Sequence, residues 1–511
     1  MESVSSRHEG DLRGSLRTFD PSQAVTVEVA IDPDLADTPA VQHTAWMLIN
    51  LLARGEGIVD RIQLHCPAKT EVQPRVVPFG VATTFATRLV EAGSSVGVVP
   101  VSDDIGPVDR VIVIGRRHPT RSIEATDLVA LGAGWWGGIT FGTSSAPAGL
   151  MSVDVARSEP FGPYIAACLA AADVFLRIRD PRRIDATVGR HGWNAWTAHS
   201  EPAPSQLGPV VNNVALDSVG LAGVGAVGAA WMHTIWATPS VTGRVMAVDA
   251  DKEGVSTSNL NRGLLFRRED LGHEKAATAA AAAAGGVDWT PVQGRFEDQH
   301  PRPSLLISAV DTNTARDALQ ATYPAQTLSA STEDLRAEVS VAGTPGIGAC
   351  LRCFNPPERV VSDAELRDRA RQADPSLAQG LAWAIGTDFA DIQRRLTTPG
   401  CDAISDRMLA QLRNHYGDDA APARFAVGFA SAMAGVLLAV ETLRLYIDPS
   451  SRPTGATART TFQFHRPDSP HNSTRPYLRD LGCPKCAPGS AALAPWHTKH
   501  ENWSSSAPSL R

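Results

Sequence analysis

The stretch from Val219 to Gly228, V-G-L-A-G-V-G-A-V-G, predicts a nucleotide site. Its first four residues suit a short buried strand, and the next six form a G-x-G-x-x-G turn that leads into a helix reaching about Ala237. In such a turn Gly223 permits the tight bend, Gly225 lets the backbone approach a phosphate, and Gly228 packs helix on strand. The helix N-terminus then offers unpaired N–H groups and a positive dipole end to an anion.

A second strand and three polar motifs follow this turn. The strand runs from Arg244 to Val248 and ends at Asp249, whose carboxylate can hold ribose hydroxyls. The motifs are D-A-D at 249–251, S-N-L-N-R at 258–262 and L-G-H-E-K at 271–275. Transfer of AMP builds negative charge that Arg262 and Lys275 could offset, whereas a hydride-donating cofactor needs no such cations. The alternative is that these two cations form a solvated surface pair.

The three motifs resemble the signature of the ThiF/MoeB/ubiquitin-activating E1 superfamily, whose members adenylate the C-terminal carboxylate of a protein. The resemblance implies that ATP and Mg²⁺ are bound. A buried strand from Ser304 to Val310 ends in Asp311, which the resemblance assigns to Mg²⁺ and the triphosphate, although Asp311 could instead cap the next helix. The implied binding residues are Gly223, Gly225, Gly228, Asp249, Asp251, Asn259, Arg262, Lys275 and Asp311.

The first half of the chain resembles a second copy of the same α/β fold. It has strands expected at 25–31, 58–65, 108–115 and 136–141, a helix at 41–54, and a small-residue helix beginning at Phe161 that a segment from Phe425 to Tyr446 repeats. An acidic segment, Asp32 to Asp37, stands where the glycine turn would be, and we expect it to repel ATP. The alternative is an unrelated α/β domain.

The predicted fold class is therefore α/β, with two Rossmann-like ThiF/E1-type adenylation domains in tandem. We expect a flexible arm at 1–22, an inactive adenylation-like domain at 24–195 and a linker at 196–210. The active adenylation domain then spans 211–487, with a helical insertion at 356–420 that carries a cysteine, and a disordered tail follows at 488–511.

Four cysteines form two C-x-x-C pairs, which predict a closed, structural Zn²⁺ site. The ligands are Cys350, Cys353, Cys483 and Cys486, and the superfamily places its zinc ligands in the same way. The alternative is that they are free or redox-active thiols. Cys66 and Cys168 lie in apolar surroundings and are expected in the core.

The remaining cysteine, Cys401, is predicted to be the nucleophile that forms a thioester. It follows the turn-forming Pro399 and Gly400 and precedes a segment expected to be helical, and a helix N-terminus lowers the pKa of a thiol. The setting is similar to the active site of E1 enzymes, except that Asp402 follows and would raise the pKa of the thiol. The alternative is an incidental loop cysteine in an enzyme that stops at the adenylate.

Composition narrows the class of protein. The 511 residues suit two to four domains, and the formal net charge of −7 without a dense Lys/Arg cluster argues against nucleic-acid binding. The start of the chain is polar, with no signal peptide, and no window approaches 18 uninterrupted apolar residues, so no membrane span is expected. Paired C-x-x-C motifs fit a reducing compartment, and we expect a cytoplasmic protein.

The fused pair of domains is most similar to the compact E1-like proteins of bacterial ubiquitination-like defence operons. That resemblance implies a ubiquitin-like protein as substrate, a thioester, and transfer to an E2-like partner. One rival is an adenylyltransferase for a sulfur carrier or a ribosomal peptide, without a thioester. Others are an NAD-dependent oxidoreductase and a catalytically dead scaffold. The two domains could form an intramolecular pseudodimer, or two chains could form a homodimer, and both possibilities are left open. Arg13 or Arg17 is a candidate to reach ATP across the domain interface.

Overall fold

The computed structural model describes residues 19–122, 126–141, 153–180, 190–333, 335–343, 348–356, 382, 388–397, 426–448 and 457–494. Four predictions fall on other residues: those for the N-terminal arm with Arg13 and Arg17, most of the 356–420 insertion, Cys401 with Asp402, and the end of the tail. Within the insertion, the described part includes the helix α12 (Phe389–Thr397).

The first half of the chain forms a sheet with eight strands. They are β1 (Val25–Ile31), β2 (Val59–His65), β3 (Val101–Ser102), β4 (Arg110–Ile114), β5 (Leu128–Ala133), β6 (Trp136–Phe141), β7 (Arg190–Asn194) and β8 (His199–Ser200). The order is β3-β2-β1-β4-β5, all parallel, followed by β6, β7 and β8, which are antiparallel. Apolar and β-branched runs such as the R-V-I-V-I of β4 suit the buried parallel strands.

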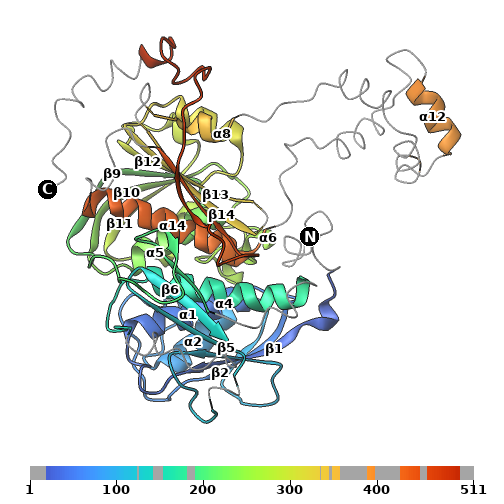
Figure 1. Cartoon of the computed structure of the whole chain (residues 1–511), viewed down its shortest axis with the longest axis vertical. Helices are drawn as coiled ribbons and strands as arrows, with labels where there is room; N and C mark the ends of the chain where they lie inside the picture. Colours follow the sequence, from blue (N-terminus) through green and yellow to red (C-terminus); the bar gives the residue numbers. More distant parts are fainter. Residues whose placement is uncertain are drawn as a thin grey trace.

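The second half adds eight more strands to the same sheet. They are β9 (Val214–Ala222), β10 (Val241–Asp249), β11 (Val287–Gln293), β12 (Leu305–Ser308), β13 (Gln326–Glu333), β14 (Arg336–Ala342), β15 (Ala458–Gln463) and β16 (Ser473–Pro476). Their order, β11-β10-β9-β12-β13 in parallel and then β14, β15 and β16 antiparallel, repeats the order of the first half strand for strand. The two runs join where His199 of β8 pairs with Ser473 of β16, so one mixed sheet crosses the molecule (Figure 1).

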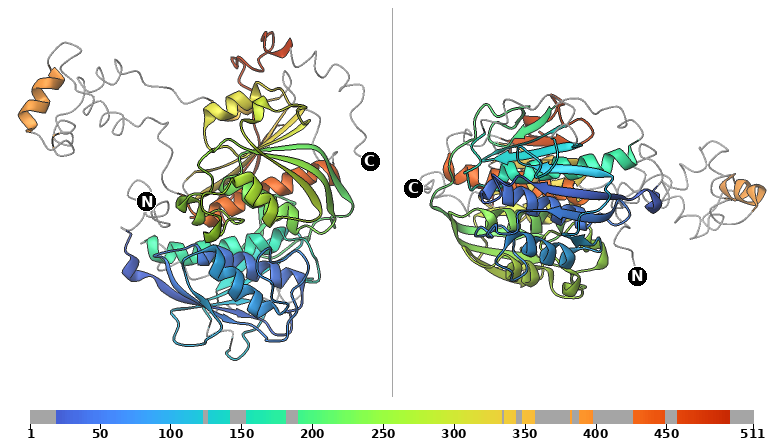
Figure 2. Two further views of the ribbon diagram at one scale, coloured as in Figure 1. Left: turned by 180° about the vertical axis from the view of Figure 1, so that it is seen from behind. Right: turned by 90° about the horizontal axis from the view of Figure 1, so that it is seen from below.

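Helices fill the space between the two parts of this sheet. They are α1 (Pro39–Ala53) and α4 (Phe161–Arg179) of the first half, and α5 (Ala226–Ala237) and α14 (Gly428–Ile447) of the second. α4 packs on α1, β5 and β6, α14 packs on α5, β13 and β14, and α4 also contacts α14 (Figure 2). Small residues make the close packing possible, because a Cβ on Gly435 of α14 would lie 2.4 Å from the Cβ of Ala230 in α5.

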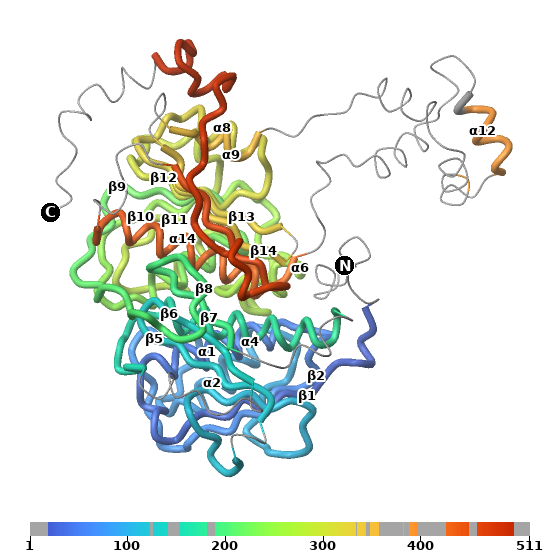
Figure 3. The backbone as a smooth tube through the Cα atoms, in the orientation of Figure 1, coloured from blue at the N-terminus to red at the C-terminus, as the bar shows by residue number. Residues whose placement is uncertain are grey.

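The remaining described helices are shorter, and Figure 3 labels α2, α6, α8 and α9 among them. They are α2 (Phe85–Val96), α6 (Thr257–Leu260), α7 (Lys275–Ala282), α8 (Asn313–Gln320) and α9 (Leu351–Phe354), with 3₁₀ turns η2 (Pro21–Gln23), η4 (Arg268–Asp270) and η5 (Phe296–Asp298). Two helices, α4 and α14, are long and apolar enough to cross a membrane by length and composition alone. Both are largely buried inside the fold, as the apolar helices of a protein core are.

The segment 196–210, expected as a linker, contacts both halves, since Trp196 accepts a hydrogen bond from Arg444 and Ser200 donates one to Pro467. It includes β8, and its backbone carbonyls at Glu201 and Pro209 accept hydrogen bonds from the indoles of Trp136 and Trp135, at 2.8 and 2.7 Å. The proline-rich segment therefore connects the two halves as a packed part of the fold. The predicted α/β fold class is confirmed, and the structure adds that the strands of both halves form one large mixed sheet.

Candidate functional site

The glycine turn has the geometry that a phosphate-binding loop requires. Gly223 has φ of +90°, and Gly228 approaches the turn so closely that a Cβ on it would lie 2.0 Å from the carbonyl oxygen of Gly223. Gly225, by contrast, has open space where its Cβ would be, with no atom of the described residues within 4 Å. The three glycines therefore bend the chain, leave room for a ligand, and pack helix on strand, in that order.

The acidic side chains at the ends of neighbouring strands face the same edge of the sheet. β10, β9 and β12 are parallel neighbours, so Asp249, the glycine turn and Asp311 follow three adjacent carboxyl ends. Asp249 is tied directly to the turn, because its Oδ2 accepts a hydrogen bond from the backbone N–H of Val224 at 2.6 Å. Ligands of open parallel sheets bind at this edge.

Asp311 is exposed and does not cap the helix that follows it. The N-cap of α8 is Thr312, whose side-chain oxygen accepts a hydrogen bond from the backbone N–H of Ala315 at 3.2 Å. The alternative explanation of Asp311 as a helix cap is therefore wrong. Its carboxylate remains available for a cation or a polar ligand at the sheet edge.

Lys275 and Asp251 form an ion pair beside the turn. Lys275 begins α7 and its side chain is nearly buried, so its ammonium lies against the Asp251 carboxylate in a place with little water. Burial raises the pKa of Asp251, but hydrogen bonds from Lys275 and from the backbone N–H of Glu253 outweigh it, and the pKa is lowered overall. The Asp251 carboxylate is thus held in its charged form, and a polyphosphate would compete with it for the lysine.

The S-N-L-N-R segment builds the short helix α6. Asn259 closes a capping box, because its Oδ1 accepts hydrogen bonds from the backbone N–H of Ser256 at 2.9 Å and from its hydroxyl at 3.1 Å. The backbone N–H of Arg262 then donates to the carbonyl oxygen of Asn259 at 3.2 Å. Asn259 thus has a structural role in the folded chain. Its hydrogen bonds fix the position at which the backbone of Arg262 leaves the helix.

The corresponding position of the first half holds a carboxylate in place of a glycine. β1 occupies the place of β9 in the strand order, so Asp32, directly after β1, stands where Gly223 follows β9. The Asp32 side chain is buried, and it accepts hydrogen bonds from the backbone N–H groups of Asp34, Arg116 and Arg117 at 3.0, 2.8 and 3.1 Å. The acidic segment was expected to repel ATP, and within it the Asp32 carboxylate is engaged by these N–H donors.

The four paired cysteines converge on one point. Cys350 and Cys353 come from α9 and its N-cap, and Cys483 and Cys486 come from the turn after β16. The Sγ–Sγ distances are 3.8 Å for 350–353, 3.7 Å for 350–483 and 3.3 Å for 353–486. Four thiolates around Zn²⁺ at 2.3 Å lie about 3.8 Å apart, so this buried cluster could hold a metal ion.

The other two described cysteines are unsuited to nucleophilic chemistry. Burial, with the charge of Asp37, raises the pKa of Cys66 to about 12, and burial raises the pKa of Cys168 still further. Thiols of this kind remain protonated at neutral pH. Cys168 is a buried core residue, as the sequence predicted, whereas Cys66 is half-buried and packs against the core.

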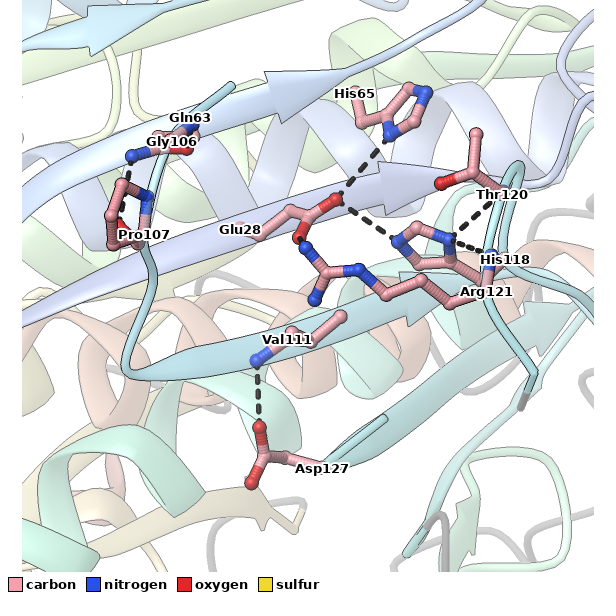
Figure 4. A network of polar contacts seen from close by, with 10 residues as sticks. All are labelled: Glu28, Gln63, His65, Gly106, Pro107, Val111, His118, Thr120, Arg121 and Asp127. Carbon is pink, nitrogen blue, oxygen red and sulfur yellow. Dashed lines mark hydrogen bonds and ion pairs between the residues drawn. The ribbon is translucent and has the colours of Figure 1, made fainter. Parts of the chain in front are cut away.

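A third polar cluster was not anticipated from the sequence (Figure 4). On β1, the buried Glu28 accepts hydrogen bonds from His65 Nδ1 at 3.3 Å and His118 Nε2 at 3.0 Å, and forms an ion pair with Arg121 at 3.0 Å. Glu28, His65 and His118 are close enough together to hold a metal ion. However, His118 Nδ1 already accepts hydrogen bonds from the backbone N–H groups of Thr120 and Arg121. A histidine that binds a metal through Nε2 needs a proton on Nδ1, so the geometry favours a hydrogen-bonded ion pair.

Sequence comparison assigns both halves of the chain. Residues 212–485, more than half of the chain, match the ThiF family, and residues 26–192 match the BilD N-terminal domain. The chain therefore belongs to the ThiF family, the adenylyltransferase family that its motifs predicted. The ThiF match spans the glycine turn, the sheet edge and both cysteine pairs, apart from Cys486.

Similar proteins extend the match over nearly the whole length. The uncharacterized protein y4jF of Sinorhizobium fredii is 23% identical over 493 residues, covering 91% of this chain and 88% of the relative. Among solved structures, E. coli MccB with ATP is 13% identical with a TM-score of 0.34, over 52% of this chain and 65% of MccB. The microcin C7 biosynthetic enzyme MccB with N-formylated MccA is 14% identical, with a TM-score of 0.34 over 54% and 66% of the two chains.

Proposed function

We propose that this chain uses ATP and Mg²⁺ to adenylate the C-terminal carboxylate of a small ubiquitin-like protein. The observation that carries the proposal is the open space at Gly225 beside Lys275 and the carboxylates of Asp249 and Asp311, in a member of the ThiF family. The turn and helix N-terminus would hold phosphate, and Asp249 the ribose hydroxyls. NAD would need the turn and Asp249 but not the two cations.

In the proposed reaction, a carboxylate oxygen of the substrate attacks the α-phosphorus of ATP. The bond from that phosphorus to the bridging oxygen of the β-phosphate breaks, and pyrophosphate leaves. Arg262 and Lys275 would stabilise the charge that grows on the phosphates, and Asp311 would hold Mg²⁺, which neutralises the leaving pyrophosphate. Asp251 would orient Lys275 through their ion pair until the triphosphate arrives.

A second step would transfer the acyl group to Cys401. Its thiolate would attack the carbonyl carbon of the adenylate, AMP would leave, and the resulting thioester would pass to an E2-like partner. The support is by elimination, because the chain has seven cysteines, of which four form the metal cluster and two have raised pKa values. Cys401 itself lies outside the described residues.

The first half would serve as an inactive adenylation-like domain that forms a pseudodimer with the second. The repeated strand order supports a common architecture for the two halves. The Asp32 carboxylate supports inactivity of the first half, because it accepts the hydrogen bonds of backbone N–H groups that a phosphate would need. This half matches the BilD N-terminal domain, a different model from the ThiF family that the second half matches. The cysteine cluster would bind one structural Zn²⁺, and we expect the whole chain in the cytoplasm.

The nucleotide assignment can be tested by calorimetry on the purified chain. Gly225→Ala should weaken binding of ATP with Mg²⁺ at least tenfold without lowering the melting temperature, because the methyl group enters the open space and not the core. Gly106→Ala is the matched control, because its Cβ would make only an ordinary contact, 3.5 Å from Gln63 Nε2, in a loop of the first half. Binding of NAD without ATP, or equal ATP affinity in both variants, would reject the proposed site.

A further inference from the structure

Arg54 is a buried arginine that crosses from the first half into the nucleotide-site half. It is the C-cap residue of α1 and is only 1% exposed. All five of its N–H donors are used: Nε donates to Asn50 Oδ1 at 2.7 Å, Nη1 to the carbonyl oxygens of Val96 at 3.1 Å and Leu260 at 2.7 Å, and Nη2 to those of Leu264 at 3.3 Å and Phe266 at 2.8 Å.

Three of these carbonyls belong to one segment of the second half. Leu260, Leu264 and Phe266 enclose Arg262, the residue that the proposed function assigns to the phosphates. Asn50, one turn earlier on α1, donates a further bond to the carbonyl oxygen of Leu264 at 3.1 Å. The backbone on both sides of Arg262 is thus fixed by a helix of the other half.

Arg54 does not have the free donors of an arginine that binds phosphate. Its guanidinium is saturated by backbone and amide oxygens, and no N–H remains to reach a nucleotide. Burial lowers its pKa to about 9, opposed by the charge of Asp270, so it stays charged at neutral pH. A charged guanidinium whose five N–H groups are all bonded is held rigidly, because each hydrogen bond restricts its movement in a different direction.

We propose that Arg54 is a positioning residue, through which the first half holds the 260–266 segment and thereby places Arg262 for adenylyl transfer. This inference rests on the proposed function, and it gives the catalytically inactive half a defined task. A displacement of about 1 Å in a catalytic group can cost on the order of 100-fold in rate. A lysine at position 54 would keep the charge but supply at most three donors from a single nitrogen, so the segment would loosen.

The chain offers a matched contact at the opposite end of the interface. Arg75, also of the first half, donates to the carbonyl oxygens of Thr238 and Pro239 at the end of α5, at 3.4 and 3.0 Å. α5 takes the place of α1 in the repeat, so both arginines bind backbone carbonyls across the two halves. Arg75 differs from Arg54 in that, within the described part of the chain, its hydrogen bonds go to Thr238 and Pro239 and none goes to residues 260–266, so Arg75→Lys is the control.

The experiment compares Arg54→Lys, Arg75→Lys and the unmodified full chain by two readouts. Hydrogen–deuterium exchange follows the amides of residues 258–266, and ATP–pyrophosphate exchange with a candidate ubiquitin-like protein gives kcat and the KM for ATP. For Arg54→Lys we expect at least tenfold faster amide exchange in the segment and a fall in kcat of about 100-fold. The KM for ATP should change less than threefold, and Arg75→Lys should match the unmodified chain.

The outcomes separate the two proposals. Unchanged amide exchange in the segment, or equal loss of kcat in Arg54→Lys and Arg75→Lys, overturns the positioning role. Loosening of the segment in a chain that never exchanges pyrophosphate refutes the proposed function but leaves Arg54 as the residue that holds the segment. If Arg54→Lys does not fold, Asn50→Ala decides, because it removes one bond to Leu264 and the partner of Arg54 Nε, and should give a smaller change in the same direction.

Discussion

Acid should destabilise the interface between the two halves through two buried histidines. His43 of α1 and His233 of α5 are fully buried, and His233 Nε2 accepts a hydrogen bond from the Trp46 indole at 3.1 Å while its ring stacks on Tyr164. Burial lowers the pKa of each histidine to about 3. Neither ring can therefore take up a proton in the folded chain at mildly acidic pH.

The pH dependence follows from the difference between the folded and unfolded chains. In the unfolded chain each histidine binds a proton as the pH falls through about 6.5, whereas in the folded chain it does so only near 3. Stability from each ring is therefore complete above about pH 6.5 and is lost as the pH falls below it. When the pH falls from 7 to 5, each ring should therefore lower the free energy of unfolding by about 2 kcal/mol.

Urea unfolding at pH 7 and pH 5 measures this loss. His233→Gln keeps an acceptor for Trp46 but cannot be protonated, so its pH-dependent loss should be about 2 kcal/mol smaller than that of the unmodified chain. His273→Gln, at an exposed position, should leave the loss unchanged. Equal losses in the unmodified chain and His233→Gln would refute the assignment of acid sensitivity to this ring.

Three further predictions concern the proposed sites. Metal analysis should find one zinc per chain, and Cys483→Ser should lower stability more than ATP affinity because none of the four cysteines belongs to the glycine turn; well under one zinc without chelator would reject the site. Arg262→Ala should lower adenylation by orders of magnitude with the fold intact, checked by steady-state kinetics and circular dichroism; unchanged kcat would remove it from the mechanism. Cys401→Ala should keep pyrophosphate exchange but lose the reducible enzyme–protein band on a non-reducing gel; a surviving thioester would exclude Cys401.

The parts of the fold with strong local patterns could be predicted from the sequence. β1 and β6 have the bounds expected for them, and the glycine turn leads from β9 into α5 as its motif requires. These patterns are local, since a buried parallel strand or a glycine turn is specified by residues within ten positions of each other. The polar strands β15 and β16 were not anticipated, because their pairing depends on neighbours far along the chain.

Buried polar groups were the least predictable feature. Glu28 interrupts an otherwise apolar strand and suggests a solvent-facing position, yet it is fully buried because His118 and Arg121, some 90 residues later, cover it. Arg54 ends an apolar helix and looks like an ordinary exposed C-terminal cation. Its function depends on four carbonyls, three of them about 210 residues away, and no sequence pattern records such partners.

The central claim, that this ThiF-family chain activates a carboxylate with ATP, is tested most directly by exchange of labelled pyrophosphate into ATP. The assay contains the purified full chain, Mg²⁺ and a candidate ubiquitin-like protein with a free C-terminus, and a copy with an amidated C-terminus is the control. Exchange that requires the free carboxylate and falls by orders of magnitude in Arg262→Ala is the predicted result. Exchange that is equal with the amidated copy, or that persists in Arg262→Ala, would contradict the account.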